Sequence, residues 1–418
     1  MIAGAEVARA AGFRYRHGMF TVMFRLVLVG ALLAAAPACG GAEAVVKTVK
    51  KDPKQKTAKQ LVVEARDQVT AGKLDEADRT YGEAYATASD NPKLAFEVLK
   101  EWVDFLVHAG RMGRARDVAK QYYDNNPADP KGYALYADAL LANNKGQDAL
   151  EVTSQLVQLN GDDAGGHERR GRALILLERT DDAIEELRKA VQLEPANAKY
   201  HMSLGSALHQ TGDFNKAALE FRAALKNAPD DPEAHVLLGM ALRDQMEYDE
   251  SKTYLEKAIE LDPKNGRAYF ELGVPYNRQL KQSEAEGAFA KAVKYAPNDS
   301  RFWYAYGEIY RVQDQIDEAI SAYRHAVELE PPYPKAIGKL GAMLVDKKLY
   351  DDAEPYLIQA IRHEPKNATN YWFLGKAYAA KKKNRQAIDN YELYLKYAPP
   401  KDADRDRAKD IINQLKRK

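Results

Sequence analysis

Residues 201–231 read HMSLGSALHQTGDFNKAALEFRAALKNAPDD, a stretch that predicts two helices and the turns that bound them. Leu204 and Leu208 are spaced to lie on one face of a first helix, and Gly212 provides a turn after it. Pro229 then ends the second helix, because proline lacks the backbone N–H that a helix interior needs. The residues expected to be buried on the second helix are Leu219, Phe221 and Leu225. The stretch therefore predicts one helix pair.

The same unit recurs every 34 residues. Glycine marks it at Gly171, Gly205, Gly239, Gly273, Gly307, Gly341 and Gly375. Proline follows at Pro195, Pro229, Pro263, Pro297, Pro331, Pro365 and Pro399. A small residue stands between them at Ala183, Ala217, Ser251, Ala285, Ala319, Ala353 and Ala387. Small residues at fixed places let two helix backbones approach closely, while large residues beside them fill the remaining space. The chain is therefore expected to be a stacked array of helix pairs.

Residues 300–331 show the motif of the array most fully. The motif residues are Trp303, Gly307, Tyr310, Ala319, Tyr323, Ala326 and Pro331. Their order resembles the tetratricopeptide repeat, and the same register predicts ten repeats over residues 58–401. The first repeat has about four extra residues, which we assign to its second helix or the loop after it. The resemblance implies an all-α fold, a right-handed α-solenoid of about ten helix pairs.

Residues 402–418 are predicted to form a C-terminal capping helix with Asp402 as its N-cap. Its apolar stripe consists of Ala408, Ile411, Ile412 and Leu415. Such a helix would cover the apolar end of the last repeat, which would otherwise be exposed to water.

The chain has 62 basic and 61 acidic residues, so no global field favours nucleic acid. Identical stacked units seldom bring unlike catalytic groups to one point, and neither terminal stretch could hold a catalytic domain. We therefore expect a binding protein for protein partners, with no enzymatic activity, cofactor, metal or small-molecule substrate. The single cysteine, Cys39, excludes a disulfide framework and any Cys-x-x-Cys metal site.

Residues 1–38 are predicted to be a signal peptide, with the true start possibly at Met19 or Met23. An apolar run, LVLVGALLAAAPA, ends immediately before Cys39 and is too short to span a bilayer comfortably. This arrangement resembles a bacterial lipoprotein signal, which implies lipidation of Cys39. Gly40 resembles the signal for the outer membrane, where the chain would face the periplasm. Cleavage with secretion to the periplasm and an uncleaved anchor are the alternatives.

Residues 39–57 are predicted to be a basic linker that tethers the repeats to the lipid anchor. Its lysines occur without any aromatic residue, which is typical of a solvated, flexible segment. Contact of these lysines with anionic lipid headgroups is the alternative.

Histidine occupies the aromatic position of the first helix in three successive repeats, at His167, His201 and His235. Neighbouring packed helices lie about 8–10 Å apart, whereas ligands of a shared zinc ion must each lie within about 2.1 Å of it. We therefore expect the imidazoles to pack in place of Trp or Tyr, with a pH-sensitive stack as the alternative. Arg170 stands where the repeat expects a buried leucine, so it either extends to solvent or contacts a carboxylate.

The family resemblance places partners along the exposed positions of the first helices. The candidate partner-binding groove consists of Arg243, Phe270, Asn277, Tyr304, Glu308, Arg311, Gly338, Ala342, Trp372 and Lys376. Gly338 and Ala342 predict a hollow between two aromatic walls, Tyr304 and Trp372. The alternative is that Phe270 and Tyr304 only pack within their own repeats.

These residues suggest a non-catalytic scaffold or adaptor that binds a peptide segment of an envelope assembly component, such as pilus, secretion or outer-membrane machinery. The alternative function is a regulatory or targeting subunit of an envelope enzyme, such as a peptidoglycan hydrolase or glycosyltransferase. Lys335 and Lys339 resemble part of the carboxylate clamp of chaperone-binding repeats. No asparagine precedes them at the required place, so that clamp is not expected.

Overall fold

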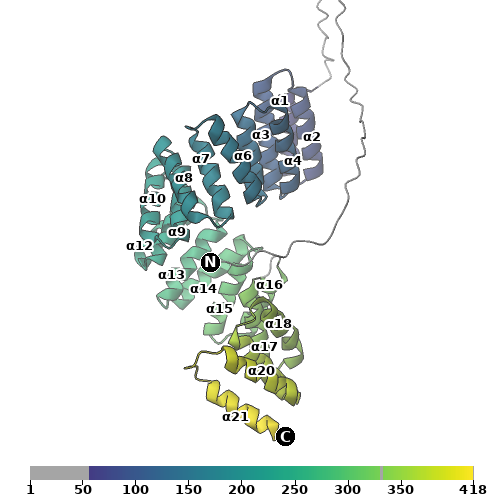
Figure 1. The fold of residues 1–418 in the computed structure, drawn as a ribbon, viewed down its shortest axis with the longest axis vertical. Helices are drawn as coiled ribbons and strands as arrows, with labels where there is room; N and C mark the ends of the chain where they lie inside the picture. The colour runs from purple at the N-terminus through teal and green to yellow at the C-terminus, as the bar shows by residue number, and fades with distance from the viewer. Residues whose placement is uncertain (1–55, 330–332, 418) are drawn as a thin grey trace, which may run out of the picture. The chain divides into compact units, whose positions relative to one another are not determined.

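The computed structural model describes residues 56–329 and 333–417 (Figure 1). These residues form 21 helices. Their bounds are α1 (Ala58–Thr70), α2 (Leu74–Thr87), α3 (Pro92–His108), α4 (Met112–Asn125), α5 (Pro130–Ala142), α6 (Gly146–Leu159), α7 (Ala164–Leu176), α8 (Thr180–Leu193), α9 (Ala198–Gln210), α10 (Phe214–Asn227), α11 (Pro232–Asp244), α12 (Tyr248–Leu261), α13 (Gly266–Arg278), α14 (Gln282–Tyr295), α15 (Ser300–Val312), α16 (Ile316–Glu328), α17 (Pro334–Asp346), α18 (Tyr350–His363), α19 (Ala368–Ala380), α20 (Asn384–Tyr397) and α21 (Arg405–Lys416).

The helices form ten antiparallel pairs followed by one terminal helix. Each odd-numbered helix from α1 to α19 packs against the even-numbered helix that follows it, and each pair packs against the next pair. Odd-numbered helices of neighbouring pairs also contact one another, as α7 and α9 do. The odd-numbered helices therefore form one layer and the even-numbered helices the other. The predicted all-α array of helix pairs is confirmed.

Most first helices begin at an Asp or Asn side chain. The N-cap side chains that accept a backbone N–H of the following turn are Asn91, Asp129, Asn197, Asp231, Asn265, Asp299 and Asn367. These carboxylates and amides satisfy N–H groups that have no partner inside the helix. The short polar segment after each repeated proline therefore fixes where the next first helix starts.

The recurring glycines mark the closest approach of the two helices in a pair. A Cβ atom at Gly205 would lie 2.6 Å from a ring atom of Phe221, and one at Gly239 would lie 2.6 Å from Leu255 Cγ. Both distances are shorter than van der Waals contact allows. Ser251 replaces the usual alanine on the second helix, and its buried hydroxyl donates to the carbonyl of Gly239 at 2.7 Å. The small residues recur at fixed places in each repeat because the backbones of the paired helices lie close together there.

The turn inside each pair contains one residue in the left-handed conformation. Glycine supplies it in three repeats, Gly72, Gly110 and Gly212. Other residue types adopt the same positive φ at Asn144, Glu178, Met246, Leu280, Asp314, Lys348 and Lys382. This conformation is unfavourable for side chains such as those of Met246 and Leu280. Packing of the two flanking helices therefore imposes the turn even where the residue type opposes it.

Two details differ from the sequence-based expectations. The four extra residues of the first repeat do not lengthen its second helix or loop. They extend α3, which has 17 residues where the other first helices of the array have 13. Leu219 is not buried as expected, because its side chain is 63% exposed while Phe221 fills the interior of the pair.

The terminal helix α21 begins later than predicted. Its N-cap is Asp404, whereas Asp402 binds the Tyr394 hydroxyl and accepts the Asp404 backbone N–H. Arg405 donates to the carbonyls of Leu395 and Ala398 at 2.7 Å and so satisfies the C-terminal end of α20. The predicted stripe packs on the last repeats. Its members are Ala408 and Ile412, which are buried, and Ile411 and Leu415, which are partly buried.

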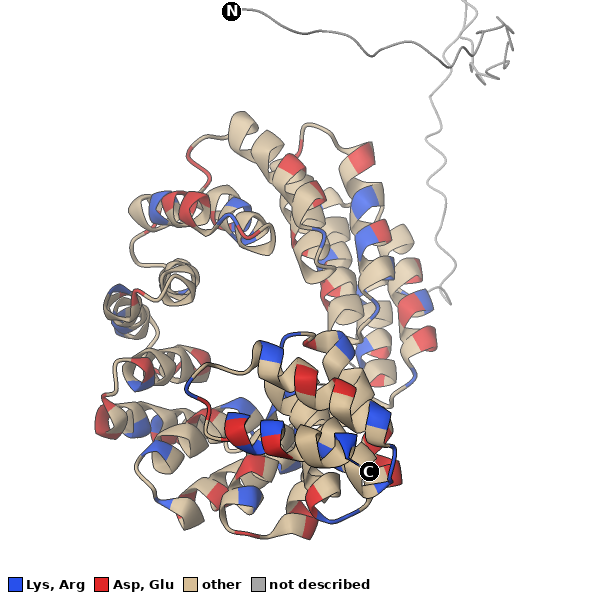
Figure 2. Ribbon diagram, turned by 60° about the horizontal axis from the view of Figure 1, so that its bottom comes forward, with Lys and Arg blue, Asp and Glu red and all other residues tan. Residues whose placement is uncertain are grey.

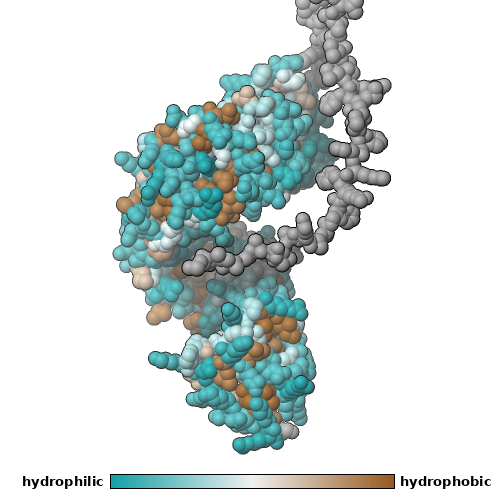
Figure 3. Space-filling model, in the orientation of Figure 1, coloured by the Kyte–Doolittle hydropathy of each residue, from teal (hydrophilic) through white to brown (hydrophobic). Residues whose placement is uncertain are grey.

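Basic and acidic residues are interspersed along the helices (Figure 2). Figure 3 shows apolar residues in small, separate patches on the visible face. In residues 56–329 and 333–417, no helix combines the length and hydropathy that crossing a membrane requires. The predicted signal peptide, Cys39 and most of the predicted linker lie outside the described residues.

Candidate functional site

A pocket lies between the first helices α15, α17 and α19, and we call it the α17 pocket. Its volume is about 430 Å³. The lining residues are Tyr304, Arg311, Pro334, Lys335, Gly338, Lys339, Ala342, Met343, Glu364, Asn367, Thr369, Asn370 and Phe373. Three successive repeats therefore contribute to one cavity on the layer of first helices.

Small residues on α17 create this cavity. Gly338 occupies the helix position that carries Phe270 and Tyr304 in the two preceding repeats, and Ala342 follows it by one turn. Tyr304 forms one aromatic wall, with its ring centroid 4.9 Å from that of Tyr333. Burial, and to a lesser extent the Glu308 carboxylate, raises the pKa of Tyr304 to about 12, so the phenol is neutral at physiological pH.

The cationic side of the pocket surrounds one carboxylate. Glu308 binds the Tyr323 hydroxyl, accepts from Arg311 at 3.0 Å and lies 3.4 Å from Lys339 Nζ. Burial alone would raise the pKa of Glu308, but these donors outweigh burial and hold it below its usual value. Lys335 adds a further, exposed cation. The pocket thus combines an ionised carboxylate with more cationic groups than that carboxylate can neutralise.

The opposite side of the pocket comes from the start of α19 and the preceding loop. Asn367 caps α19 by accepting the Thr369 N–H at 3.1 Å, and its amide donates to Glu364 at 2.6 Å. Asn370 follows one residue after Thr369 and is 4% exposed. Its carboxamide faces Gly338, since a Cβ atom at Gly338 would lie 2.6 Å from Asn370 Oδ1. Asn370 is not among the residues predicted from the sequence, although a polar residue at a helix position that is apolar in the preceding repeats was a readable signal.

Four of the ten predicted groove residues line the pocket: Tyr304, Arg311, Gly338 and Ala342. Glu308 is joined to the pocket through its bonds to Arg311 and Lys339. The hollow predicted at Gly338 and Ala342 is therefore present in the structure.

The predicted second wall is wrong, because Trp372 lies outside the pocket and is only 8% exposed. Its ring packs against Tyr391 and Tyr394, with centroid distances of 5.4 and 5.1 Å, and Arg407 of α21 lies over it. The neighbouring residue, Phe373, lines the cavity instead.

The remaining predicted groove residues lie elsewhere. Lys376 forms an ion pair with Asp346 at 2.8 Å and lies over the Phe373 ring. Phe270 is stacked on Phe302 of the next repeat with ring centroids 4.5 Å apart and lies 5.8 Å from Phe289 of its own repeat, so it packs between repeats and not only within its own. Asn277 is partly exposed near the end of α13.

Arg243 is held by carboxylates of its own chain. Its guanidinium donates to Asp244 at 2.8 and 2.9 Å and to Glu271 of α13. Burial alone would raise the pKa of Asp244, but hydrogen bonds from His209 and Arg243 hold it well below its usual value. These bonds link α9, α11 and α13 and leave Arg243 outside the pocket.

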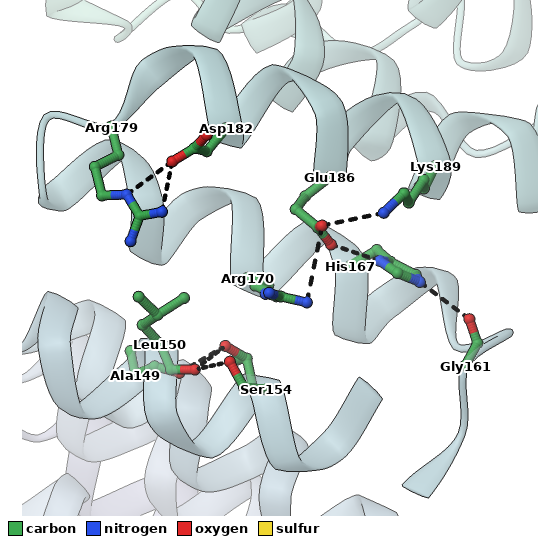
Figure 4. A network of polar contacts seen from close by, with 11 residues as sticks. Ala149, Leu150, Ser154, Gly161, His167, Arg170, Arg179, Asp182, Glu186 and Lys189 are labelled. Carbon is green, nitrogen blue, oxygen red and sulfur yellow. Dashed lines mark hydrogen bonds and ion pairs between the residues drawn. The ribbon is translucent and has the colours of Figure 1, made fainter. Parts of the chain in front are cut away.

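The three histidines are structural side chains of their own repeats. His167 Nε2 donates to the carbonyl of Gly161 at 3.0 Å, and its Nδ1 lies 2.7 Å from Glu186 (Figure 4). His201 and His235 donate in the same way to the carbonyls of Pro195 and Pro229, at 2.9 Å each. Trp303 and Tyr371 do so in later repeats, to Pro297 at 2.7 Å and Pro365 at 2.9 Å. In these five repeats the position thus carries an aromatic residue with a donor at its tip, whereas Ile337 occupies it in the repeat of α17.

Arg170 contacts a carboxylate, which is one of the two alternatives predicted for it from the sequence. Its guanidinium lies 3.8 Å from Glu186, the residue that also binds His167 (Figure 4). Arg169 forms a two-pronged pair with Asp138 at 2.8 and 3.0 Å. These arginines are thus bound inside the chain.

A second cavity of about 690 Å³ lies between α1, α2 and α3. Its charged residues are already paired in part, since Glu101 accepts from Arg66 at 2.7 Å and from the Tyr81 hydroxyl at 2.9 Å. The α17 pocket is the better candidate site, because its cationic groups exceed its carboxylates and three successive repeats contribute to it.

Family models for the tetratricopeptide repeat match residues 62–130, 134–198, 169–232 and 232–265. The tetratricopeptide domain of cytochrome c-type biogenesis protein H matches residues 288–405, which contain the α17 pocket. None of the curated proteins is significantly similar to the chain in sequence.

Solved structures share the fold at low sequence identity. The APC/C hetero-tetramer Cut9–Hcn1 aligns with a TM-score of 0.52 and 14% identity over 77% of this chain and 76% of that chain. The human IFIT1 dimer with PPP-AAAA aligns with a TM-score of 0.50 and 19% identity over 80% of this chain and 82% of that chain. At these identities the likeness shows the fold alone. The family-model matches extend with short gaps from residue 62 to residue 405, and the chain therefore belongs to the tetratricopeptide-repeat family.

Proposed function

We propose that this protein is a non-catalytic scaffold that binds an extended peptide segment of an envelope assembly component in the α17 pocket. The proposal rests on the pocket itself. Its apolar walls are Tyr304, Met343 and Phe373, and they lie beside Arg311 and the lysines of α17. A concave site of this kind, with a few placed polar groups, suits one side chain and its neighbouring peptide groups. The match of this region to a domain of a biogenesis protein supports a role in assembling another protein.

The proposal includes an anchor at Cys39 in the outer membrane, with the repeats facing the periplasm. It is supported by the apolar run before Cys39 and by the position of that residue as the only cysteine of the chain. A lipid on Cys39, followed by the basic linker, would hold the scaffold near partners that are assembled at the membrane.

Replacement of Cys39 by alanine should release the protein from membranes. We expect the Cys39→Ala variant in the soluble periplasmic fraction, without label from a fatty-acid probe, whereas the unaltered protein is labelled and sediments with outer membranes. Cell fractionation and metabolic labelling measure both effects. A variant that stays in the membrane fraction, with no label on the unaltered protein, contradicts the anchor.

Replacement of Tyr304 by alanine should abolish retention of the native partner, because loss of an aromatic hot spot typically costs about 2 kcal/mol or more. Affinity capture from envelope extracts, followed by mass spectrometry, measures the retention of the partner. Phe270→Ala is the matched control, because Phe270 occupies the same helix position but lies outside the pocket. Equal retention by both variants contradicts the proposed site. The identity of the retained protein distinguishes an assembly adaptor from the regulatory subunit of an envelope enzyme.

A further inference from the structure

Two exposed apolar side chains stand at turns where the backbone disfavours them. Met246 and Leu280 adopt the left-handed conformation, with φ of 67° and 60°. They are also the most exposed large apolar residues of the described chain, at 74% and 79%. Glycine adopts this conformation without strain and supplies it at Gly72, Gly110 and Gly212. Folding alone therefore favours glycine at both positions, and the apolar side chains require another explanation.

The other repeats show that this turn position does not require an apolar residue. Where glycine is absent, the residue with positive φ is polar or charged in five repeats, at Asn144, Glu178, Asp314, Lys348 and Lys382. Among the ten turns within the described pairs, only the consecutive α11–α12 and α13–α14 turns carry large apolar residues there. Exposed apolar residues that gather at one place on a surface mark a site of interaction.

Hydrogen bonds hold these two turns side by side. Gln279, next to Leu280, donates to Asp249 of α12 at 3.1 Å and accepts from Lys252 of α12 at 3.0 Å. These bonds fix the α13–α14 turn against the start of α12. Neighbouring packed helices lie about 8–10 Å apart. Met246 and Leu280 therefore project from one surface, close enough together to contact the same partner.

The residues that follow Met246 and Leu280 have opposite charges. Glu247 and Lys281 occupy the same repeat position, as the N-cap residues of α12 and α14. Both side chains are exposed, and neither caps its helix. We call Met246, Glu247, Leu280 and Lys281 the turn patch. It consists of two equivalent halves, each with one apolar side chain, and one half is acidic while the other is basic.

We infer that the turn patch binds the turn patch of a second copy of this protein. A two-fold axis between the copies places the α11–α12 turn of one against the α13–α14 turn of the other. Equivalent repeat positions then meet, so that Met246 contacts Leu280 of the second copy and Glu247 contacts Lys281 of the second copy. Each contact occurs twice. The arrangement buries four apolar side chains and forms two ion pairs.

The charges of the patch favour a second copy over other occupants. A uniformly charged partner, such as an anionic lipid surface or a nucleic acid, is attracted by one half of the patch and repelled by the other. A second copy related by the two-fold axis is complementary to both halves at once. The ion pairs select this orientation, whereas the burial of Met246 and Leu280 supplies most of the affinity. Two turns form a small interface, so we expect a weak dimer.

Self-association would give the scaffold two partner-binding pockets. The α17 pocket shares no residue with the turn patch, so each copy keeps its own pocket accessible. Two pockets in one assembly strengthen binding to a partner that is itself repeated, because the second binding event becomes intramolecular. Self-association does not require the proposed function, since the turn patch and the pocket are separate sites.

Sedimentation velocity of the purified full-length chain, with Cys39→Ala to exclude a lipid, tests self-association. We expect a change from monomer to dimer over roughly a hundredfold range of concentration, as for other weak interfaces. The double variant Met246→Gly with Leu280→Gly should associate about tenfold more weakly or worse. Its melting temperature should stay unchanged or rise, because glycine relieves the backbone strain. Lys348→Gly with Lys382→Gly is the matched control, since both lysines adopt the same conformation outside the patch.

Charge reversal tests the contact between copies. Glu247→Lys and Lys281→Glu should each abolish association, because like charges then meet twice in the dimer. An equimolar mixture of these two variants should associate again, because both ion pairs are restored with their charges exchanged. A mixture that stays monomeric overturns the inference.

Three further outcomes would overturn the inference. The first is a chain with Cys39→Ala alone that stays monomeric over the whole range. The second is equal association of the double glycine variant. The third is a monomer that binds vesicles of anionic lipid through Met246 and Leu280, which would assign the patch to a lipid surface.

Failure of self-association is distinguishable from failure of the proposed function. Tyr304→Ala should associate as well as the protein with an intact pocket, since Tyr304 lies outside the turn patch. If Tyr304→Ala loses the native partner and no form of the chain dimerises, the scaffold function stands and the dimer is wrong. If the chain dimerises and Tyr304→Ala retains the native partner, the dimer stands and the α17 pocket is not the site.

Discussion

Replacement of Gly205 by valine should destabilise the protein by about 3 kcal/mol, because overpacking a closely packed interface forces the backbone or neighbouring side chains to move. Even a single Cβ atom at Gly205 would lie 2.6, 2.8 and 3.0 Å from three ring atoms of Phe221. That ring is 1% exposed and cannot turn into solvent. Urea unfolding followed by circular dichroism measures the loss.

Gly287→Val controls for the residue type alone. Gly287, like Gly205, lies inside a helix, in this case α14, the second helix of its pair. A Cβ atom at Gly287 would have no neighbour within 4 Å. We expect its stability to change by less than about 0.5 kcal/mol, since valine and glycine differ little in helix propensity. In the double variant Gly205→Val with Phe221→Ala, the cost should be smaller than the sum of the single costs. Additive costs would show that Phe221 is not the obstacle.

The array could be predicted from sequence because its constraints repeat. Close contact between paired helices requires glycine at one place in each repeat, as Gly205 and Gly239 show, so the period of 34 residues is visible without any knowledge of partners. The start of α21 was harder to predict from the sequence. Asp402 looks like an N-cap, but its carboxylate binds Tyr394 of the previous helix instead.

The candidate site could be predicted only in part. Gly338 and Ala342 stood out because they lack the bulk of the same positions in other repeats, and the pocket lies there. Trp372 and Phe373 are adjacent in sequence, and which of them faces the cavity depends on how α19 is rotated and on cover from Arg407 of α21. Asn370 could be recognised as part of the cavity wall only once its neighbours were known.

Replacement of Arg243 by methionine should destabilise the protein by about 3–5 kcal/mol at neutral pH, the usual cost of leaving one member of a buried ion pair alone. Glu271 is the member left behind, and its side chain is 8% exposed. Methionine keeps much of the aliphatic volume of arginine, so the loss of stability reflects the missing charge more than lost packing. Asp244 retains its hydrogen bond from His209 at 2.8 Å in this variant.

The loss of stability in the Arg243→Met variant should grow as the pH rises. Burial raises the pKa of Glu271 above its usual value, while the charges of Arg243 and Arg267 oppose that rise. Without Arg243, this folded-state pKa rises further. The unfolded chain then releases the proton of Glu271 at a lower pH than the folded chain, so stability falls as pH rises through the folded-state pKa. The difference between the variant and the unaltered protein should therefore be largest at pH 7–8 and should shrink as the pH falls toward 4.5, the value of an unperturbed glutamate.

The double variant Arg243→Met with Glu271→Gln separates a structural role of Arg243 from a role in partner binding. Removal of both charges leaves no unpaired carboxylate, so we expect stability near that of the unaltered protein and no pH-dependent difference. Since the structure places Arg243 outside the α17 pocket, this stable variant should still retain the native partner. Lost retention in a stable double variant would mean that partners also contact α11 and α13. A double variant as unstable as the single one would show that Glu271 is not the cause of the loss.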